Sequence, residues 1–362
     1  MAQGHKLILT WRGFLKPARD GNDAFLEDLK LRPELATLAA SPVAWAAVAG
    51  LGLTALAVKS LFDKGSRKYD GNVGAEYDAW TSEGILEYYW GEHIHLGVYN
   101  EAERAAGYRK KNFKQAKYDF VDDMLSFSEV GTFTRMLDVG CGFGGSSRHI
   151  AKMFPNASIE GITLSQKQVE RGTELAKERN IPNASFQVMD ALAMTFPDES
   201  FDLVWACESG EHMPDKKKYV EEMIRVLKPG GSLVIACWCQ REETPENPIT
   251  DAERQELQFL YDEWAHPYFI SIQEFCRLMQ ASGKAVDIKS DDWTPQTLPS
   301  WRHSIWVGAE DPLPVIVKPM LWYKIARDAV TIEKMHRAFD KGLMQYGLMR
   351  CTKAAAAPVA QL

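Results

Sequence analysis

Two glutamates and a histidine lie close together in the segment WACESGEHMPDKKK, residues 205–218. Glu208, Glu211 and His212 directly follow an apolar run, so we expect them at the end of a buried strand, where an open α/β sheet binds its ligands. A carboxylate or an imidazole in that place can accept a proton from a bound substrate. The alternative is a solvated turn in which the histidine caps a helix. The neighbouring segments decide between these two interpretations.

The segment LDVGCGFGG, residues 137–145, ends an apolar run in a cluster of glycines. Glycines let the backbone turn sharply and approach a ligand without Cβ collisions. Their spacing differs from the G-x-G-x-x-G of dinucleotide-binding turns, and Asp138 precedes the first glycine, Gly140, by two residues. An acid at a strand end suits a ligand with an amino group and a positive charge, and S-adenosylmethionine (SAM) has both. We therefore expect SAM; a structural turn that binds nothing is the alternative.

Polar residues also follow the next two apolar runs. Thr163 to Gln168 offer hydroxyl and amide groups that can contact a ribose or cap a helix, and both roles are compatible. Asp190 places a carboxylate where an adenine amino group would lie. Each strand end of the predicted sheet thus carries a group that a SAM molecule can use.

His93 and His95 are two further candidates for a proton acceptor. They lie in an aromatic segment, residues 77–99, which is predicted to be neither strand nor helix throughout. No accompanying set of acidic or cysteine ligands is evident, so the sequence predicts no metal site. Aromatic side chains can either wall a site for a sulfonium ion or pack in an ordinary core; the candidates are Tyr88, Tyr89, Trp90 and Trp205.

Alternating apolar runs and amphipathic helices must position these residues. Strands are expected near 135–139, 157–164, 186–191, 201–208 and 232–239, with helices at 165–180 and 215–228 between them. Strand and helix in repetition predict a parallel sheet with crossover helices. Beyond Gln240 the pattern favours a mostly helical cap over the sheet, and Asp215 to Lys218 are expected at a solvated helix start.

Composition narrows the classes of partner. The net charge of −7, with acids and bases interspersed, argues against nucleic acid. The six cysteines lie mostly in apolar runs, which favours free thiols in a reducing compartment. Cys237 and Cys239 form a single C-x-C pair and are interpreted as strand residues rather than zinc ligands.

Residues 35–58 contain no charged side chain and are long enough to cross a membrane as a helix. We expect a membrane span or anchor there; a helix packed against the catalytic domain is the alternative. No cleaved secretory signal is predicted before it. Four regions are expected: an extension with this apolar helix at 1–68, a SAM-binding core at 69–240, a substrate cap at 241–353 and a disordered tail at 354–362.

The sequence resembles class I SAM-dependent methyltransferases, and more narrowly the gamma-tocopherol methyltransferase group, with sterol C-24 methyltransferases as more distant relatives. The resemblance runs from about residue 69 to 353. Its most specific parts are YYWGEHIHLGVY and ESGEHMPDK, whereas LDVGCGFGG is common to the superfamily. It implies a Rossmann-like sheet with helices on both faces and SAM as the cofactor. The implied cofactor-binding residues are Asp138, Gly140, Cys141, Gly142, Thr163, Leu164, Ser165, Gln168, Asp190, Ala191 and Glu208.

Two features depart from the family pattern. The acid that many methyltransferases keep at the end of the second strand is absent, because Glu160 lies too early. The first 68 residues also do not resemble a plastid transit sequence.

The resemblance implies methyl transfer to a ring carbon of a tocopherol-like prenylated phenol, of the gamma- to alpha-tocopherol type. The candidates for the base are His212, Glu208, His93 and His95, with Glu211 as a weaker one. Methylation of a sterol side chain or of an amine nitrogen is the alternative within enzymes, and a non-catalytic SAM-binding membrane protein is the alternative outside them. We expect an intracellular, membrane-associated enzyme, with a plastid membrane favoured over the endoplasmic reticulum.

Overall fold

A computed structural model describes residues 73–355 of the protein. By its internal contacts the chain divides into two units, Met1–Gly65 and Ser66–Leu362, and the description concerns the second. The apolar run at 35–58 and most of the expected tail lie outside the described residues. Between 73 and 355 no helix combines the length and the apolar composition needed to cross a membrane.

A seven-stranded sheet in the order β3-β2-β1-β4-β5-β7-β6 forms the centre of the described part. The first five strands are parallel to one another, and β7 runs antiparallel to both β5 and β6. This order is that of a Rossmann-like methyltransferase sheet and confirms the predicted α/β class. The strands are β1 (Arg135–Val139), β2 (Ser158–Thr163), β3 (Ala184–Val188), β4 (Phe201–Cys207), β5 (Leu227–Gln240), β6 (Ala285–Asp292) and β7 (Met344–Lys353).

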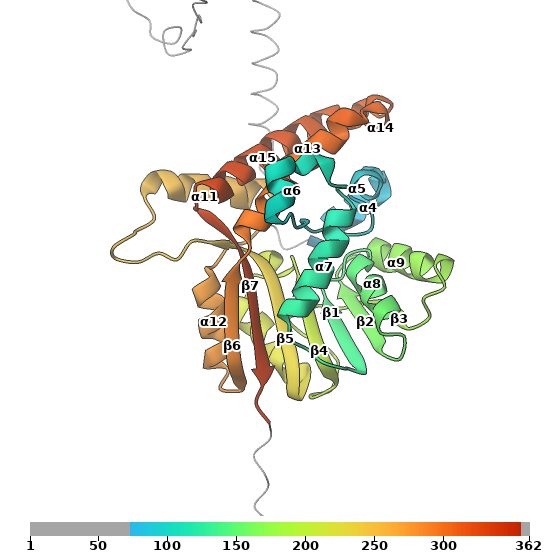
Figure 1. Ribbon diagram of the computed structural model, residues 1–362, viewed down its shortest axis with the longest axis vertical. Coiled ribbons are helices and arrows are strands. Elements are labelled where there is room, and N and C mark those ends of the chain that lie inside the picture. Colours follow the sequence, from blue (N-terminus) through green and yellow to red (C-terminus); the bar gives the residue numbers. More distant parts are fainter. Residues whose placement is uncertain (1–72, 356–362) are drawn as a thin grey trace, which may run out of the picture. The chain divides into compact units, whose positions relative to one another are not determined.

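Helices pack on both faces of this sheet and gather at one of its ends (Figure 1). The α-helices before the cap are α4 (Val73–Glu83), α5 (Ile85–Trp90), α6 (Glu101–Ala106), α7 (Gln115–Phe127), α8 (Gly145–Met153), α9 (Gln166–Glu178) and α10 (Lys216–Val226). Those after β5 are α11 (Asp251–Glu263), α12 (Ile272–Ala281), α13 (Thr294–Glu310), α14 (Leu313–Ile316) and α15 (Trp322–Asp340). Short 3₁₀ helices are η2 (Tyr108–Lys110), η3 (Gly210–His212) and η4 (Pro319–Leu321).

The alternation of side chains along the strands divides the core into two layers. In β4, Leu203 and Trp205 belong to one apolar cluster, whereas Val204 and Ala206 belong to the other. The first cluster includes residues of α7 and α8, and the second includes residues of α10 and α12. Because successive strand residues point to opposite faces, near-continuous apolar strands need a helix layer on each side.

The C-terminal region differs from the expected helical cap in one respect. Two of its segments, β6 and β7, are strands that complete the sheet, and α12 packs on them. Of the remaining helices, α11, α13 and α15 gather over the end of the sheet opposite the C-terminus of β7 (Figure 1). Since β7 is antiparallel to β5, this is the end at which the parallel strands finish.

The N-terminal segment of the described part forms two short helices, α4 and α5, followed by extended chain to Asn100. Polar contacts attach it to the cap: the Glu83 carboxylate accepts from Lys324 Nζ at 2.6 Å, and Tyr89 Oη donates to the Asp311 carbonyl oxygen at 2.6 Å. Lys117, which is fully buried, donates to the Trp90 carbonyl oxygen at 2.8 Å. These contacts hold the segment beside the strand ends.

Candidate active site

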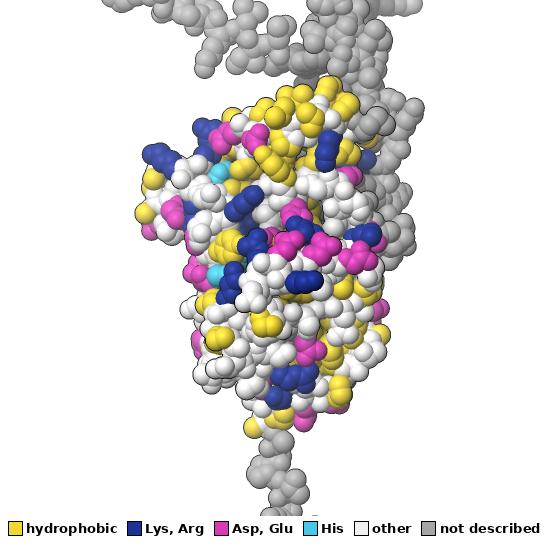
Figure 2. Space-filling view, turned by 90° about the vertical axis from the view of Figure 1, so that its right-hand side faces the viewer, with side chains coloured by type: hydrophobic (Ala, Val, Ile, Leu, Met, Phe, Trp, Pro, Cys, Tyr) yellow, Lys and Arg dark blue, Asp and Glu magenta, His cyan; other side chains and the backbone are white. Residues whose placement is uncertain are grey.

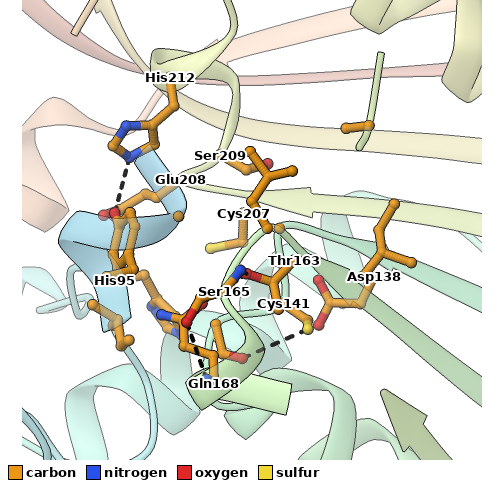
Figure 3. Close-up of a pocket in the computed structure, with 18 of the residues that line it drawn as sticks. His95, Asp138, Cys141, Thr163, Ser165, Gln168, Cys207, Glu208, Ser209 and His212 are labelled. Atoms are coloured by element: carbon orange, nitrogen blue, oxygen red, sulfur yellow. Dashed lines mark hydrogen bonds between the residues drawn. The ribbon is translucent and has the colours of Figure 1, made fainter. Parts of the chain in front are cut away.

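A pocket of about 240 Å³ lies at the ends of β1, β2, β3 and β4. Every residue that the sequence suggested for the cofactor lines it, as do four of the five candidate bases, His93, His95, Glu208 and His212, whereas Glu211 does not. Figure 3 shows the residues of β1 and of the β2 exit grouped on one side, with Glu208 and His212 on another. The ends of β1, β2, β3 and β4, together with the chain between α5 and α6, therefore bring these side chains to one pocket.

At two positions of the glycine turn after β1, a positive φ coincides with a lack of room for a side chain. Gly140 has φ 84°, and a Cβ there would lie 2.3 Å from the Cβ of Ser209. Gly144 has φ 72°, and its Cβ would lie 2.2 Å from the Phe186 ring. Glycine is required at both, because other residues rarely adopt this backbone conformation and would also collide. The turn leaves a backbone cradle that a ligand can approach closely.

Asp138 is 2% exposed at the end of β1 and lines this cradle. Ser147 Oγ donates to its Oδ2 at 2.6 Å. Burial raises the pKa of the carboxyl to about 7, which the hydrogen bond only partly offsets. A ligand ammonium group would remove this penalty by pairing with the charge, so the methionine part of SAM fits this position.

The β2 exit is held together by its own hydrogen bonds. Thr163 Oγ1 donates to Gln168 Oε1 at 2.7 Å, and Ser165 accepts from the Gln168 amide at 3.1 Å as the N-cap of α9. Ser165 Oγ also donates to the Asp78 carboxylate, which in addition accepts from the Lys167 amide at 3.1 Å. The acid that the sequence lacks at this strand end is thus supplied to the loop by α4, although Asp78 does not line the pocket itself. Glu160 pairs with Arg135 away from it.

The β3 exit provides the remaining polar wall. Asp190 accepts from the Leu192 amide at 2.8 Å through Oδ1, and the buried Ala191 lies beside it. Leu164, at 45% exposure, lines the same pocket from the β2 exit. Apolar side chains next to a carboxylate suit an adenine ring with its amino group.

A second, more apolar cavity of about 400 Å³ adjoins the first. Helices α5, α13, α14 and α15 supply most of its walls, together with the aromatic side chains of Trp238, Trp264 and Trp301. We call it the apolar chamber. It shares Tyr77, Ile94, Glu208 and His212 with the cofactor pocket. These four residues therefore mark the junction at which a cofactor and a second ligand would meet.

Glu208 has a strained backbone at this junction, with φ 49°. Its Oε1 accepts from the Leu96 amide at 2.8 Å and from Tyr346 Oη at 2.7 Å. Burial, and then the neighbouring charge of Glu211, raises the pKa of its carboxyl to about 8. A positive φ at a non-glycine residue costs free energy and is commonly kept where a side chain must be aimed. The Leu96 amide and Tyr346 Oη thus hold the Glu208 carboxylate in a fixed orientation at the junction.

His212 contacts side chains from two distant segments. Its Nε2 is 2.9 Å from Tyr77 Oη, and its ring stacks on His266 with centroids 4.3 Å apart. Burial, and then the charge of Lys216, lowers the pKa of His212 to about 3. At neutral pH this imidazole is uncharged, so it can donate or accept a hydrogen bond but holds a proton poorly.

The chamber wall also contains buried polar atoms without partners among residues 73–355: Glu211 Oε2, His212 Nδ1, both ring nitrogens of His266 and Trp238 Nε1. Burial raises the pKa of Glu211 to about 7. Buried polar atoms are rarely left unpaired without a reason, and a polar ligand group can satisfy them. The sequence did not single out His266 or Tyr77, because a lone histidine or tyrosine among apolar residues carries no distinguishing signal.

The histidine pair lies on the cofactor side of the junction. His95 Nδ1 donates to the Leu96 carbonyl oxygen at 2.8 Å, so His95 Nε2 must accept, and His93 Nδ1 donates to it at 3.1 Å. His93 Nε2 is then an acceptor, and within the described chain it has no partner. Neither histidine lines the apolar chamber, so the structure does not place this pair beside an acceptor molecule.

The structure decides one open alternative and corrects one expectation. Trp205 is fully buried in β4 and lines neither cavity, so it packs in the core instead of walling the site. Lys216 is 3% exposed, not solvated: its Nζ donates to the carbonyl oxygens of Gly210 and Glu211 at 2.7 and 2.9 Å. Tyr89 and Trp90 do line the chamber, whereas Tyr88 does not.

Comparisons with known proteins agree with this geometry. Residues 136–231 match the family described as a methyltransferase domain. The chain is 42% identical over 294 residues to the 2-methyl-6-phytyl-1,4-hydroquinone methyltransferase of Synechocystis, covering 78% of this chain and 87% of that protein. It is 35% identical to the chloroplastic tocopherol O-methyltransferase of Arabidopsis thaliana, covering 77% and 81%.

Solved structures show the same fold. The geranyl diphosphate C-methyltransferase of Streptomyces coelicolor, in complex with S-adenosyl-L-homocysteine, superposes with a TM-score of 0.61 at 20% identity, covering 79% of this chain and 98% of that one. The described residues fit SAM as the cofactor through the buried Asp138 carboxylate and the glycine cradle. The chain therefore belongs to the SAM-dependent methyltransferase family that includes the 2-methyl-6-phytyl-1,4-hydroquinone and tocopherol methyltransferases.

Proposed function

We propose that the enzyme methylates a ring carbon of a tocopherol-like prenylated phenol. One observation carries this proposal: an apolar chamber of about 400 Å³ meets the cofactor pocket at Glu208 and His212. A phenol head at the junction and a prenyl tail in the chamber would satisfy both parts of that arrangement. The names of the two relatives support the same class of acceptor, one a prenyl hydroquinone and one a tocopherol.

SAM supplies an electrophilic methyl group next to a sulfonium sulfur. The protein must align the acceptor carbon with it and make that carbon electron-rich by holding or removing the phenolic proton. Tyr77, Ile94 and the chamber walls position the ring and exclude water.

Glu208 is the proton acceptor in this proposal, and His212 orients the phenolic hydroxyl. The pKa of Glu208 is about 8 and that of His212 about 3, so the fraction of Glu208 that is ionised at neutral pH accepts a proton far better than the imidazole does, and this fraction grows as the pH rises. Glu211, also on the chamber wall, is placed to accept the proton that the ring carbon loses after methylation. His93 and His95 serve the cofactor side instead.

The region assignments extend from this site. We propose that residues 69–240 contain the SAM-binding core and that the helices within residues 241–353 cap the acceptor. The run at 35–58 is proposed as a membrane anchor, and residues 354–362 as a tail. A plastid membrane is the proposed location, since the relative from Arabidopsis thaliana is named as chloroplastic.

Incubation of the purified protein with methyl-labelled SAM and a panel of acceptors tests the proposal. The panel contains gamma-tocopherol, a prenyl hydroquinone, a sterol with a side-chain double bond and a tertiary-amine precursor. We expect label in the two prenylated phenols, at a ring carbon when the product is analysed by NMR. Label on the phenolic oxygen would replace C-methylation by O-methylation, and label only in the sterol or the amine would refute the substrate class.

A further inference from the structure

The segment from Leu313 to Tyr323 exposes an unusual number of large apolar side chains. The exposed fractions are 63% for Leu313, 55% for Ile316, 63% for Val317, 52% for Trp322 and 37% for Tyr323. These five residues lie within eleven positions that include α14 and η4. The segment lies at the top of the face shown in Figure 2, where apolar atoms gather. We call these five residues the α14 surface.

Helix α14 separates this surface from the apolar chamber. Val315 and Ile316 line the chamber, together with Pro312, whereas Leu313 and Val317 do not. Leu313 and Val317 thus face away from the chamber, whereas Ile316 both lines it and is 55% exposed. The wall between the surface and the acceptor chamber is a single short helix.

The polar groups around the α14 surface are already paired within the protein. Trp322 Nε1 donates to the Val315 carbonyl oxygen at 2.9 Å, and Lys318 Nζ donates to the Glu83 carbonyl oxygen at 2.5 Å. Tyr88 Oη donates to Asp311 Oδ2 at 2.6 Å on the other side. Bringing this surface into an apolar environment therefore leaves few hydrogen bonds to break, and burial of its side chains is favourable.

We propose that the α14 surface rests on a lipid bilayer and that the acceptor passes from the bilayer into the chamber beside α14. Exposed apolar residues flanked by tryptophan and tyrosine are typical of segments that lie at a membrane interface. Lys318 is the only charged residue between Leu313 and Tyr323, and it is paired with the Glu83 carbonyl oxygen, so apolar burial rather than attraction to anionic lipid drives the contact. The inference rests on the proposed function, because a prenylated phenol is dissolved in the bilayer.

A double variant of the full chain, Leu313→Ser/Val317→Ser, tests the kinetic consequence. Neither residue lines the chamber, so methylation of a water-soluble phenol without a prenyl tail should be unchanged. Methylation of a prenylated phenol presented in phosphatidylcholine vesicles should fall by roughly tenfold or more, because two apolar contacts with the bilayer are lost. The control is Met153→Ser/Val286→Ser, which removes two apolar side chains exposed to 46% and 47% elsewhere on the molecule.

Three results would overturn the inference: an unchanged rate with vesicles, an equal fall in both assays, or an equal fall in the control variant. If the wild-type protein methylates neither phenol, the proposed function fails and the contact is tested by a spin label. A nitroxide at Val317→Cys should, after vesicles are added, collide more with oxygen and less with a water-soluble nickel chelate, measured against the labelled wild-type protein. Protection from the chelate before vesicles are added would assign the surface to another part of the chain or to a second copy.

Discussion

At the scale of single residues, the site contains two carboxyl groups whose pKa values burial raises to neutral pH or slightly above it. The pKa of Asp138 is raised from 3.8 to about 7, and that of Glu208 from 4.5 to about 8, in both cases mainly by burial. The folded protein therefore binds protons at pH values where the unfolded chain has lost them. This links stability, cofactor binding and catalysis to the same groups.

The free energy of unfolding is predicted to fall as the pH rises from 3.8 to about 7, that is, from the ordinary pKa of an aspartate to the raised pKa of Asp138 in the folded protein. Below pH 3.8 the carboxyl is protonated in both states, and between 3.8 and about 7 only the folded protein keeps the proton. The free energy of unfolding then decreases by up to about 1.4 kcal/mol per pH unit for one proton. Asp138→Asn should remove this slope, so the difference in Tm between the variant and the wild-type protein should increase between pH 5 and 7. Identical profiles for wild type and Asp138→Asn would show that the carboxyl titrates normally.

Glu208→Gln tests the assignment of the base. The amide oxygen can still accept from Leu96 and Tyr346, so SAM affinity should change little. The value of kcat should fall by about 10²–10⁴-fold, the usual contribution of general base catalysis. Wild-type kcat should rise with pH as the carboxylate ionises, and the variant should lack that rise. Unchanged turnover would transfer the role to His212 or Glu211, whose alanine and glutamine variants are measured in parallel.

The residues that the sequence suggested for the cofactor line one pocket because each lies at or just after the end of an apolar run. The sequence did not identify Tyr77 and His266, since these reach the site from α4 and from the loop after α11. It also placed Lys216 in solvent, although the helix start at Asp215 was expected. The Lys216 side chain turns inward because the carbonyl oxygens of Gly210 and Glu211 lie beneath it. The hydrophobic periodicity of a sequence does not show where backbone carbonyl groups lie.

At the scale of elements, the 3₁₀ turn η3 carries Glu211 and His212 and is held by Lys216. Lys216→Met leaves the carbonyl oxygens of Gly210 and Glu211 without their buried donor. We expect a loss of about 1–3 kcal/mol in the free energy of unfolding and a higher KM for the acceptor. The matched control is Lys217→Met, whose side chain is 68% exposed and should stay within about 0.5 kcal/mol of wild type. If Lys216→Met and Lys217→Met changed stability and KM equally, Lys216 would have no positioning role.

The parallel strands β1, β2, β4 and β5 were predictable as elements because both of their faces are largely buried, which produces near-continuous apolar runs, whereas β3 lies at the sheet edge and is mostly not buried. The two antiparallel strands were not predictable. In β6, AVDIKSDD is mostly polar and lies at the sheet edge, and in β7 the run MQYGLMRCTK mixes apolar and polar residues without clean alternation. Their pairing is fixed by contacts between distant parts of the chain. The local sequence pattern of a strand cannot predict such contacts.

At the scale of the whole molecule, the cap is tied together by a buried ion pair. Arg327 on α15 donates to both carboxylate oxygens of Glu263 on α11, each at 2.7 Å. Arg327→Met leaves Glu263 buried without its partner and should cost about 3–5 kcal/mol of unfolding free energy. Adding Glu263→Leu should restore much of this loss. Urea unfolding of the single and double variants measures it, and a double variant no more stable than the single one would contradict this account.

The central claim is that the apolar chamber holds a prenyl tail while the phenol head meets the cofactor. It is tested most directly by kcat/KM for a prenylated phenol and for the same phenol without its tail. Burial of even four methylene groups, at about 0.8 kcal/mol each, favours the prenylated acceptor by roughly a hundredfold or more.

Gly308→Leu should fill part of the chamber, because Gly308 lines it and a Cβ there meets nothing within 4 Å. This variant should lose most of the preference for the tail while methylating the tail-less phenol at the wild-type rate. Equal kcat/KM for the two acceptors in the wild-type enzyme, or a preference that Gly308→Leu leaves intact, would contradict the account.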